Sequence, residues 1–191
     1  MARPSAELTR LQEISGAFYA GKVDRDAARS AVIDVIQGRL RCSRVSLWRF
    51  DGMPGDLRLL CFASKREDGA LNTVPAELHQ REYRDYFAAL VQTGTFVSVD
   101  AMADPTLQPM RANYLVTNHV CSLLDAAFMV NGRAYGMVCC EQTDTVRRWR
   151  PAEIIALRAM VAKLALLMAS GGDEILWSSP SLPMDPLPLT A

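Results

Sequence analysis

The stretch VCSLLDAAFMVNGRAYGMVCCEQT, residues 120–143, predicts two β-strands joined by a tight turn. Two largely apolar runs flank Asn131-Gly132. This dipeptide is typical of two-residue hairpin turns, because both of its residues must take φ > 0. Such a turn would place Val130 opposite Arg133 and Asp125 opposite Val138.

This register divides the side chains of the two strands between two faces of a sheet. One face is expected to carry Cys121, Leu123, Asp125, Ala127, Val138 and Cys140. The other is expected to carry Ser122, Leu124, Ala126, Phe128, Tyr135, Met137, Cys139 and Glu141. Since both faces are mostly apolar, both should be covered. We therefore expect the hairpin in the middle of a sheet with helices on each side.

Composition excludes several classes of protein. The 191 residues suffice for one domain with a core, and the formal net charge of zero gives no electrostatic reason to expect nucleic acid or an anionic membrane as a partner. No apolar run reaches the roughly 20 residues of a membrane helix, and the N-terminus lacks an apolar signal core. Five cysteines without motif spacing fit a reducing compartment. A cytoplasmic protein is expected.

The rest of the chain reads as alternating helices and strands. Helices are expected over 6–19, 24–40, 77–92, 110–118 and 151–170, and further strands over 43–50, 57–64 and 95–99. From Gly171 the composition changes, and residues 182–189 are rich in proline. We expect one domain over residues 1–170 and a flexible or extended tail over 171–191.

This order of elements resembles a GAF domain, the small sensory module of bacterial signalling proteins and phosphodiesterases. The segments that carry the resemblance are SRVSLWRFDG (43–52), REYRDYFAAL (81–90), TFVSVDAMADP (95–105), SLLDAAFMVNGRAYGMVCCE (122–141) and RRWRPAEIIALRAMVAKLA (147–165). The resemblance implies an α+β fold, a GAF/PAS-like central antiparallel sheet with helices on both faces. It also implies that the first and last helices share one face, and that the middle helices and loops enclose a ligand pocket on the other.

The first and last helices carry near-heptad apolar stripes that leave two interpretations open. Leu8 and Leu11 belong to one stripe, and Leu157 and Leu164 to the other. They could form a homodimer bundle, as in many GAF domains, or they could simply pack on the sheet.

Six residues are candidates for the pocket. Asp125 interrupts an apolar strand, so its carboxylate must be paired, hydrogen-bonded or wet; backbone N–H groups or Arg111 are candidate structural partners. Tyr83, Tyr86 and Tyr114 would add hydroxyls over an apolar floor. His119 and Cys121 complete the candidate set.

No cofactor or metal is expected. The Cys-His pair of linear-tetrapyrrole GAF domains does not match His119-Val120-Cys121, the cyclic-nucleotide constellation is not found, and no metal-ligand spacing occurs. The leading interpretation is a non-catalytic sensory domain that binds an unidentified small molecule and signals to a separate output domain or protein through its terminal helices. Two alternatives stay open: a thiol enzyme similar to the GAF proteins that reduce free methionine sulfoxide, and a module for interaction only.

Overall fold

The computed structural model describes residues 5–130 and 133–171. Its centre is an antiparallel sheet with the strand order β3-β2-β1-β6-β5-β4. The strands are β1 (Arg44–Met53), β2 (Asp56–Arg66), β3 (Ala76–His79), β4 (Thr95–Ser98), β5 (Val120–Val130) and β6 (Arg133–Thr143). The helices are α1 (Ala6–Tyr19), α2 (Arg25–Leu40), α3 (Arg84–Thr93), η1 (Pro105–Met110), η2 (Arg111–Leu115) and α4 (Pro151–Gly171). This mixed architecture is the expected α+β fold.

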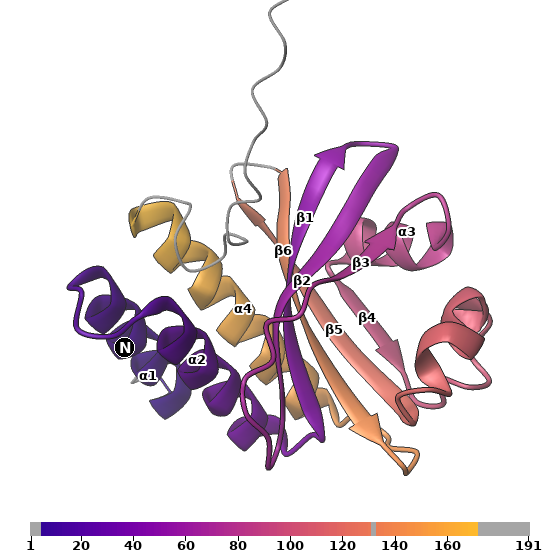
Figure 1. Ribbon diagram of the computed structural model, residues 1–191, viewed down its shortest axis with the longest axis horizontal. Coiled ribbons are helices and arrows are strands. Elements are labelled where there is room, and N and C mark those ends of the chain that lie inside the picture. Colours follow the sequence, from indigo (N-terminus) through magenta and orange to yellow (C-terminus); the bar gives the residue numbers. More distant parts are fainter. Residues whose placement is uncertain (1–4, 131–132, 172–191) are drawn as a thin grey trace, which may run out of the picture.

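The helices divide between the two faces of the sheet. One face is covered by α1, α2 and α4, and the other by α3 and the short helices η1 and η2 (Figure 1). The two chain-end helices therefore lie together on one side, as expected. None of the helices in the described part of the chain is long and apolar enough to cross a membrane.

The hairpin of β5 and β6 is internal to the sheet, as the sequence predicts, because β6 also pairs with β1 and β5 with β4. Its turn, residues 131–132, lies outside the described residues. Val130 lies opposite Arg133 as expected, but Asp125 lies opposite Cys139 and not opposite Val138. The predicted register is wrong beyond the turn because β6 carries one extra residue, Tyr135, at a bulge.

The bulge exchanges the two faces of β6. On the face of α3, the side chains of Met137 and Cys139 pack with Leu123. On the face of α4, Val138 and Cys140 pack with the residues of β5 that alternate with Leu123 and Asp125. Asp125 therefore shares its face of the sheet with Met137 and Cys139, and not with Val138 and Cys140 as expected.

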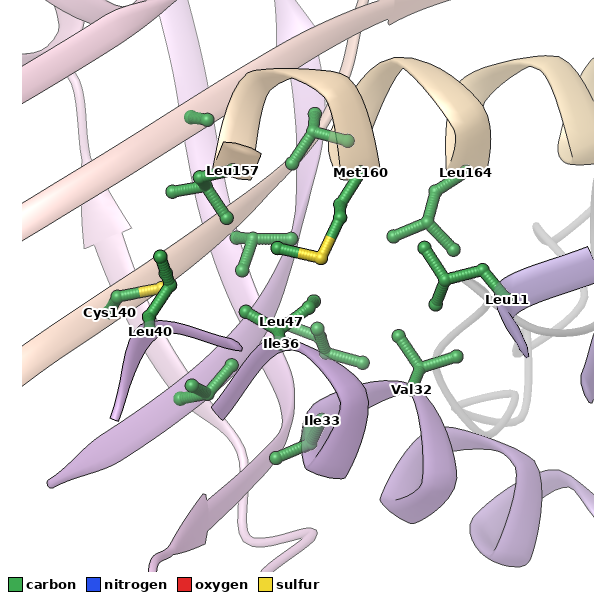
Figure 2. Close-up of a cluster of buried hydrophobic side chains, with 14 of the residues drawn as sticks. Leu11, Val32, Ile33, Ile36, Leu40, Leu47, Cys140, Leu157, Met160 and Leu164 are labelled. Atoms are coloured by element: carbon green, nitrogen blue, oxygen red, sulfur yellow. The ribbon is translucent and has the colours of Figure 1, made fainter. Parts of the chain in front are cut away.

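The apolar stripes of the terminal helices are buried within one chain. Leu11, Leu157 and Leu164 lie in a core cluster with α2 and the sheet, and Leu8 packs against it (Figure 2). Leu11 and Leu157 are both 0 % exposed. The alternative interpretation, that the stripes pack within one chain, therefore accounts for Leu11, Leu157 and Leu164, while Leu8 is half-buried. The homodimer stays a prediction.

Two expected helices differ from the structure. The predicted helix over 77–92 begins only at Arg84, because Ala76–His79 form the edge strand β3, in which His79 lies opposite Arg58 of β2. The predicted helix over 110–118 is instead the pair η1 and η2, which covers 105–115. In contrast, the start of α2 is as expected, with the Asp24 carboxylate accepting a hydrogen bond from the backbone N–H of Ala27 at 2.7 Å.

Candidate functional site

A cavity of about 200 Å³ lies between the sheet and the layer of α3, η1 and η2. It is on the face of the sheet opposite α1, α2 and α4. Its lining comprises Trp48, Ala76, Glu77, Leu78, Tyr83, Tyr86, Met110, Asn113, Tyr114, Leu123, Met137, Cys139 and Glu141. The cavity is thus walled mainly by apolar and aromatic side chains with a few polar groups, which is the usual character of a small-molecule site.

Strand β6 supplies the floor of the cavity. Successive side chains of a strand point to opposite faces, so Met137, Cys139 and Glu141 all project toward the cavity. Helix α3 supplies one wall through Tyr86, which is buried, and Tyr83 at the residue before the helix is half-buried. The aromatic stripe of this helix therefore faces the sheet, as its amphipathic sequence predicts.

One end of the cavity holds a buried ion pair. Glu141 is fully buried, and its carboxylate pairs with the guanidinium of Arg44 on β1. Tyr114 links the two, because its hydroxyl donates to Glu141 at 2.5 Å and accepts from Arg44 at 3.0 Å. Arg44 also donates to the Asn118 side-chain oxygen at 3.1 Å. Each charge is thereby hydrogen-bonded as well as paired, as a buried ion pair requires.

These contacts shift the pKa values of the cluster. Burial by itself would lower the pKa of Arg44, but the charge of Glu141 and the contact with Tyr114 outweigh burial, so the pKa is raised. The pKa of Tyr114 is raised well above its usual value by desolvation and by the charge of Glu141. The guanidinium therefore stays charged and the phenol stays neutral at physiological pH.

Asp125 lies behind the lining, between the cavity and β4. Its side chain is 0 % exposed, and Oδ2 accepts a hydrogen bond from the Tyr86 hydroxyl at 2.7 Å. Oδ1 has no hydrogen-bond partner within the described part of the chain. Burial raises the pKa of Asp125 to about 7, an effect that the neighbouring Cys139 thiol and the Tyr86 hydroxyl only partly offset. The carboxyl group therefore titrates near neutral pH.

The structure brings four of the six candidate residues together. Tyr83, Tyr86 and Tyr114 line the cavity, and Asp125 adjoins it through Tyr86. The Tyr86 hydroxyl thus donates a hydrogen bond to Asp125, in place of the backbone N–H groups or Arg111 that the sequence suggested.

The other two candidates lie outside the lining. The His119 side chain is 74 % exposed, and its Nδ1 lies 3.6 Å from the Asp144 carboxylate. The Cys121 thiol donates to the His119 carbonyl at 3.7 Å. His119 directly precedes β5, and Cys121 lies at a second register shift, between Val120 and Ser122. Neither side chain lines the cavity.

The sequence interpretation missed the ion pair and much of the floor. Glu141, like Asp125, is an acid at an apolar strand, so the same criterion could have selected it. The predicted register places Met137 and Cys139 on a face without Asp125, because the bulge at Tyr135 has no clear sequence signal. Arg44 is the first residue of β1 and can be identified only once the pairing of β1 with β6 is known.

The thiol at the cavity is poorly suited to nucleophilic chemistry. Burial, Asp125 and Glu141 raise the pKa of Cys139 well above its usual value. Burial also raises the pKa of Cys61, which belongs to the same core cluster, to about 12. Since the thiolate is the reactive form, both groups stay unreactive thiols near neutral pH. Over residues 5–130 and 133–171, no group of three or more histidine, cysteine, aspartate or glutamate side chains could hold a metal ion.

Sequence comparison identifies the family. Residues 24–168 match the sequence profile of the GAF domain, so this chain belongs to the GAF domain family. No curated protein has a sequence that matches this chain.

Solved structures similar to this one are also GAF domains or contain them. The phycocyanobilin-bound GAF domain from a cyanobacterial phytochrome has a TM-score of 0.67 at 14 % identity, over 88 % of this chain and 97 % of that chain. The blue-light absorbing form of the Thermosynechococcus elongatus PixJ GAF domain has a TM-score of 0.60 at 16 % identity, over 86 % and 90 %. The Stigmatella aurantiaca phytochrome photosensory core module has a TM-score of 0.63 at 15 % identity, over 91 % and 39 %. At these identities the similarity establishes the fold alone.

Proposed function

We propose that this GAF domain is a non-catalytic sensory domain that binds a small molecule in the cavity between β6 and α3. The observation that carries the proposal is the position of the cavity. It is lined by buried polar groups, and it lies across the sheet from the packed helices α1 and α4. The domain would comprise residues 1–170 and act on a separate output domain or protein. Its homodimeric state and cytoplasmic location stay predictions.

Strand β6 offers one connection between the cavity and the core cluster that contains α4. Cys139 and Glu141 line the cavity, and Cys140 between them packs in the core beneath Leu157 of α4 (Figure 2). A ligand that displaced β6 would therefore also disturb the packing of the core cluster to which Leu157 of α4 belongs. The ligand can shift such helices only by its difference in affinity for the two arrangements.

A bilin, which the phytochrome GAF domain binds, fits this chain poorly. An apolar cavity of about 150 Å³ accommodates a benzene ring. The cavity of about 200 Å³ is therefore several times too small for a chain of four pyrrole-derived rings. The cysteine at the cavity, Cys139, is buried in the floor, and Cys121 lies outside the lining. We accordingly derive no role for a bilin.

The thiol-enzyme and interaction-only alternatives are tested together with the proposal. Met110→Trp should fill the cavity, because Met110 is buried in its lining, whereas Val116→Trp changes an exposed residue just beyond η2. A panel of metabolites screened by native mass spectrometry should yield a ligand that binds the wild-type protein and Val116→Trp but not Met110→Trp. Turnover of free methionine sulfoxide would favour the enzyme, and a failure of every compound to bind would favour the interaction-only module.

A further inference from the structure

The buried hydrogen-bond donors on the cavity wall are already used within the protein. The Trp48 indole N–H donates to the Ser46 hydroxyl at 2.7 Å. The Tyr86 hydroxyl donates to Asp125 at 2.7 Å, and the Tyr114 hydroxyl donates to Glu141 at 2.5 Å. A hydroxyl has a single proton to donate, so Tyr86 and Tyr114 can only accept from a ligand while these bonds persist.

The positive charge next to the cavity is also bound within the protein. No lysine, arginine or histidine is among the described residues that line the cavity. The adjacent cation, Arg44, is bound by Glu141, Asn118 and Tyr114. An anionic ligand would therefore meet carboxylates without an available cation to offset them.

Acceptor capacity, in contrast, is in surplus. A carboxylate can accept about four hydrogen bonds. Glu141 accepts one from Tyr114 and one from Arg44, and it lines the cavity. Asp125, one hydrogen bond behind the wall, has Oδ1 buried without a partner among the described residues. At the mouth, Glu77 pairs with Arg58 at 3.2 Å and is 38 % exposed, so it can accept further bonds. The Tyr83 hydroxyl and the Asn113 amide, on half-buried and exposed side chains, add donors to the lining, but its buried groups offer more acceptors than donors.

The shape and size of the cavity restrict the ligand further. Trp48 and Tyr86 present aromatic side chains to it, and Met110 and Met137 add apolar, adaptable ones. Since about 150 Å³ accommodates benzene, about 200 Å³ corresponds to one ring or a small fused pair.

We propose that the cavity binds a small planar nitrogen heterocycle of one or two fused rings that carries N–H donors and no anionic group. This inference rests on the proposed function and names the ligand class of the same site. The ring would lie among the aromatic and methionine side chains, and its N–H groups would donate to Glu141, to the Tyr86 oxygen and toward Asp125. A ring of the same size without donors would leave these buried acceptors unsatisfied, which lowers affinity by about tenfold or more.

Three probes of similar size test the ligand class: 2-aminobenzimidazole with N–H donors, 1-methylindole without them, and the anion indole-2-carboxylate. Protein labelled with ¹³C at the methionine methyls reports binding by NMR, because Met110 and Met137 line the cavity while Met53 and Met129 are exposed elsewhere. We expect 2-aminobenzimidazole to shift the Met110 and Met137 signals, with a dissociation constant at least about tenfold lower than that of 1-methylindole. Indole-2-carboxylate should bind more weakly still.

A matched pair of variants tests the contribution of Asp125. At pH 8, where most Asp125 carboxyl groups are ionised because their pKa is about 7, Asp125→Asn places an amide where an acceptor stood, so the preference for 2-aminobenzimidazole over 1-methylindole should fall several-fold. Asp85→Asn, at an exposed position of α3, should leave the preference unchanged. An unchanged preference in Asp125→Asn would overturn the contribution of Asp125.

The outcomes separate this inference from the proposed function. Equal or tighter binding of 1-methylindole or indole-2-carboxylate at Met110 and Met137 would overturn the ligand class and leave the sensory site intact. If no probe moved either methyl signal, the cavity would not admit molecules of this size, and both proposals would fall.

Discussion

Replacing Asp125 by asparagine should make the domain less sensitive to rising pH. Burial raises the pKa of this carboxyl group from 3.8 to about 7 in the folded protein, against partial opposition from Cys139 and Tyr86. Between these two values the folded state holds a proton that the unfolded chain has lost. The free energy of unfolding of the wild type therefore falls as pH rises through this window, and the loss persists above it.

The size of the effect follows from the same shift. A change from 3.8 to about 7 corresponds to about 4 kcal/mol over the whole window, of which about 2–3 kcal/mol falls between pH 5 and pH 8. An asparagine at this position does not titrate, so the stability of Asp125→Asn relative to the wild type should increase by about 2 kcal/mol over that interval. At pH 5, where most of the wild-type carboxyl groups are protonated, the variant should be of similar or lower stability.

Urea unfolding followed by tryptophan fluorescence at pH 5, 6, 7 and 8 measures this difference. Asp85→Asn serves as the control, because Asp85 is exposed on the same helix that carries Tyr86. The control should follow the wild-type profile. Parallel profiles for Asp125→Asn and the wild type would show that Asp125 is ionised in the folded protein over the whole range, and the account of its burial would then be wrong.

Three further predictions concern stability, measured as thermal or urea unfolding. Leu157→Ala should cost about 2–5 kcal/mol because Leu157 is fully buried on the inner face of α4, whereas Ile155→Ala, at a position of the same helix that is 68 % exposed, should cost little. Similar losses in the two variants would contradict the burial of the stripe. Glu141→Ala should cost about 3 kcal/mol because the Arg44 guanidinium then stays buried without its counter-charge, and an unchanged melting temperature would refute the ion pair. Gly52→Ala should cost at least about 1–2 kcal/mol, since φ is +90° and the new Cβ would collide with the Asp56 carbonyl oxygen. Its control Gly16→Ala, in open space on α1, should stabilise the protein by about 0.5–1 kcal/mol. A loss of stability in both variants or in neither would count against this geometry.

The sequence predicts the elements whose signals are local. The first helix has the expected bounds, Ala6–Tyr19, because its apolar spacing is regular. The helical periodicity of residues 77–92 predicts a helix in the segment where the structure has the strand β3. Its actual conformation depends on pairing with β2, a contact between segments distant in the chain. Local patterns cannot anticipate such a contact.

The candidate site was predictable to a similar extent and for a similar reason. The tyrosines were found because they occupy the apolar face of a helix or stand near it, and Asp125 because a buried acid is conspicuous in a strand. Glu141 and its partner Arg44 come from strands that are neighbours only in the folded sheet. Finding them would have required the register of β6, which the bulge shifts by one residue.

That single additional residue in β6 also sets how the hairpin tolerates changes in length. Without Tyr135, Gly136 could still lie opposite Phe128, so a deletion of this one residue would be absorbed by loss of the bulge. A second deletion nearby could not be absorbed by a bulge, because every later residue of β6 would move one place toward the turn. Glu141 would then be carried among the leucines beneath α4 and away from Arg44. A loss of two residues from this part of β6 would therefore exchange the two faces of the strand, whereas a substitution would leave its register unchanged.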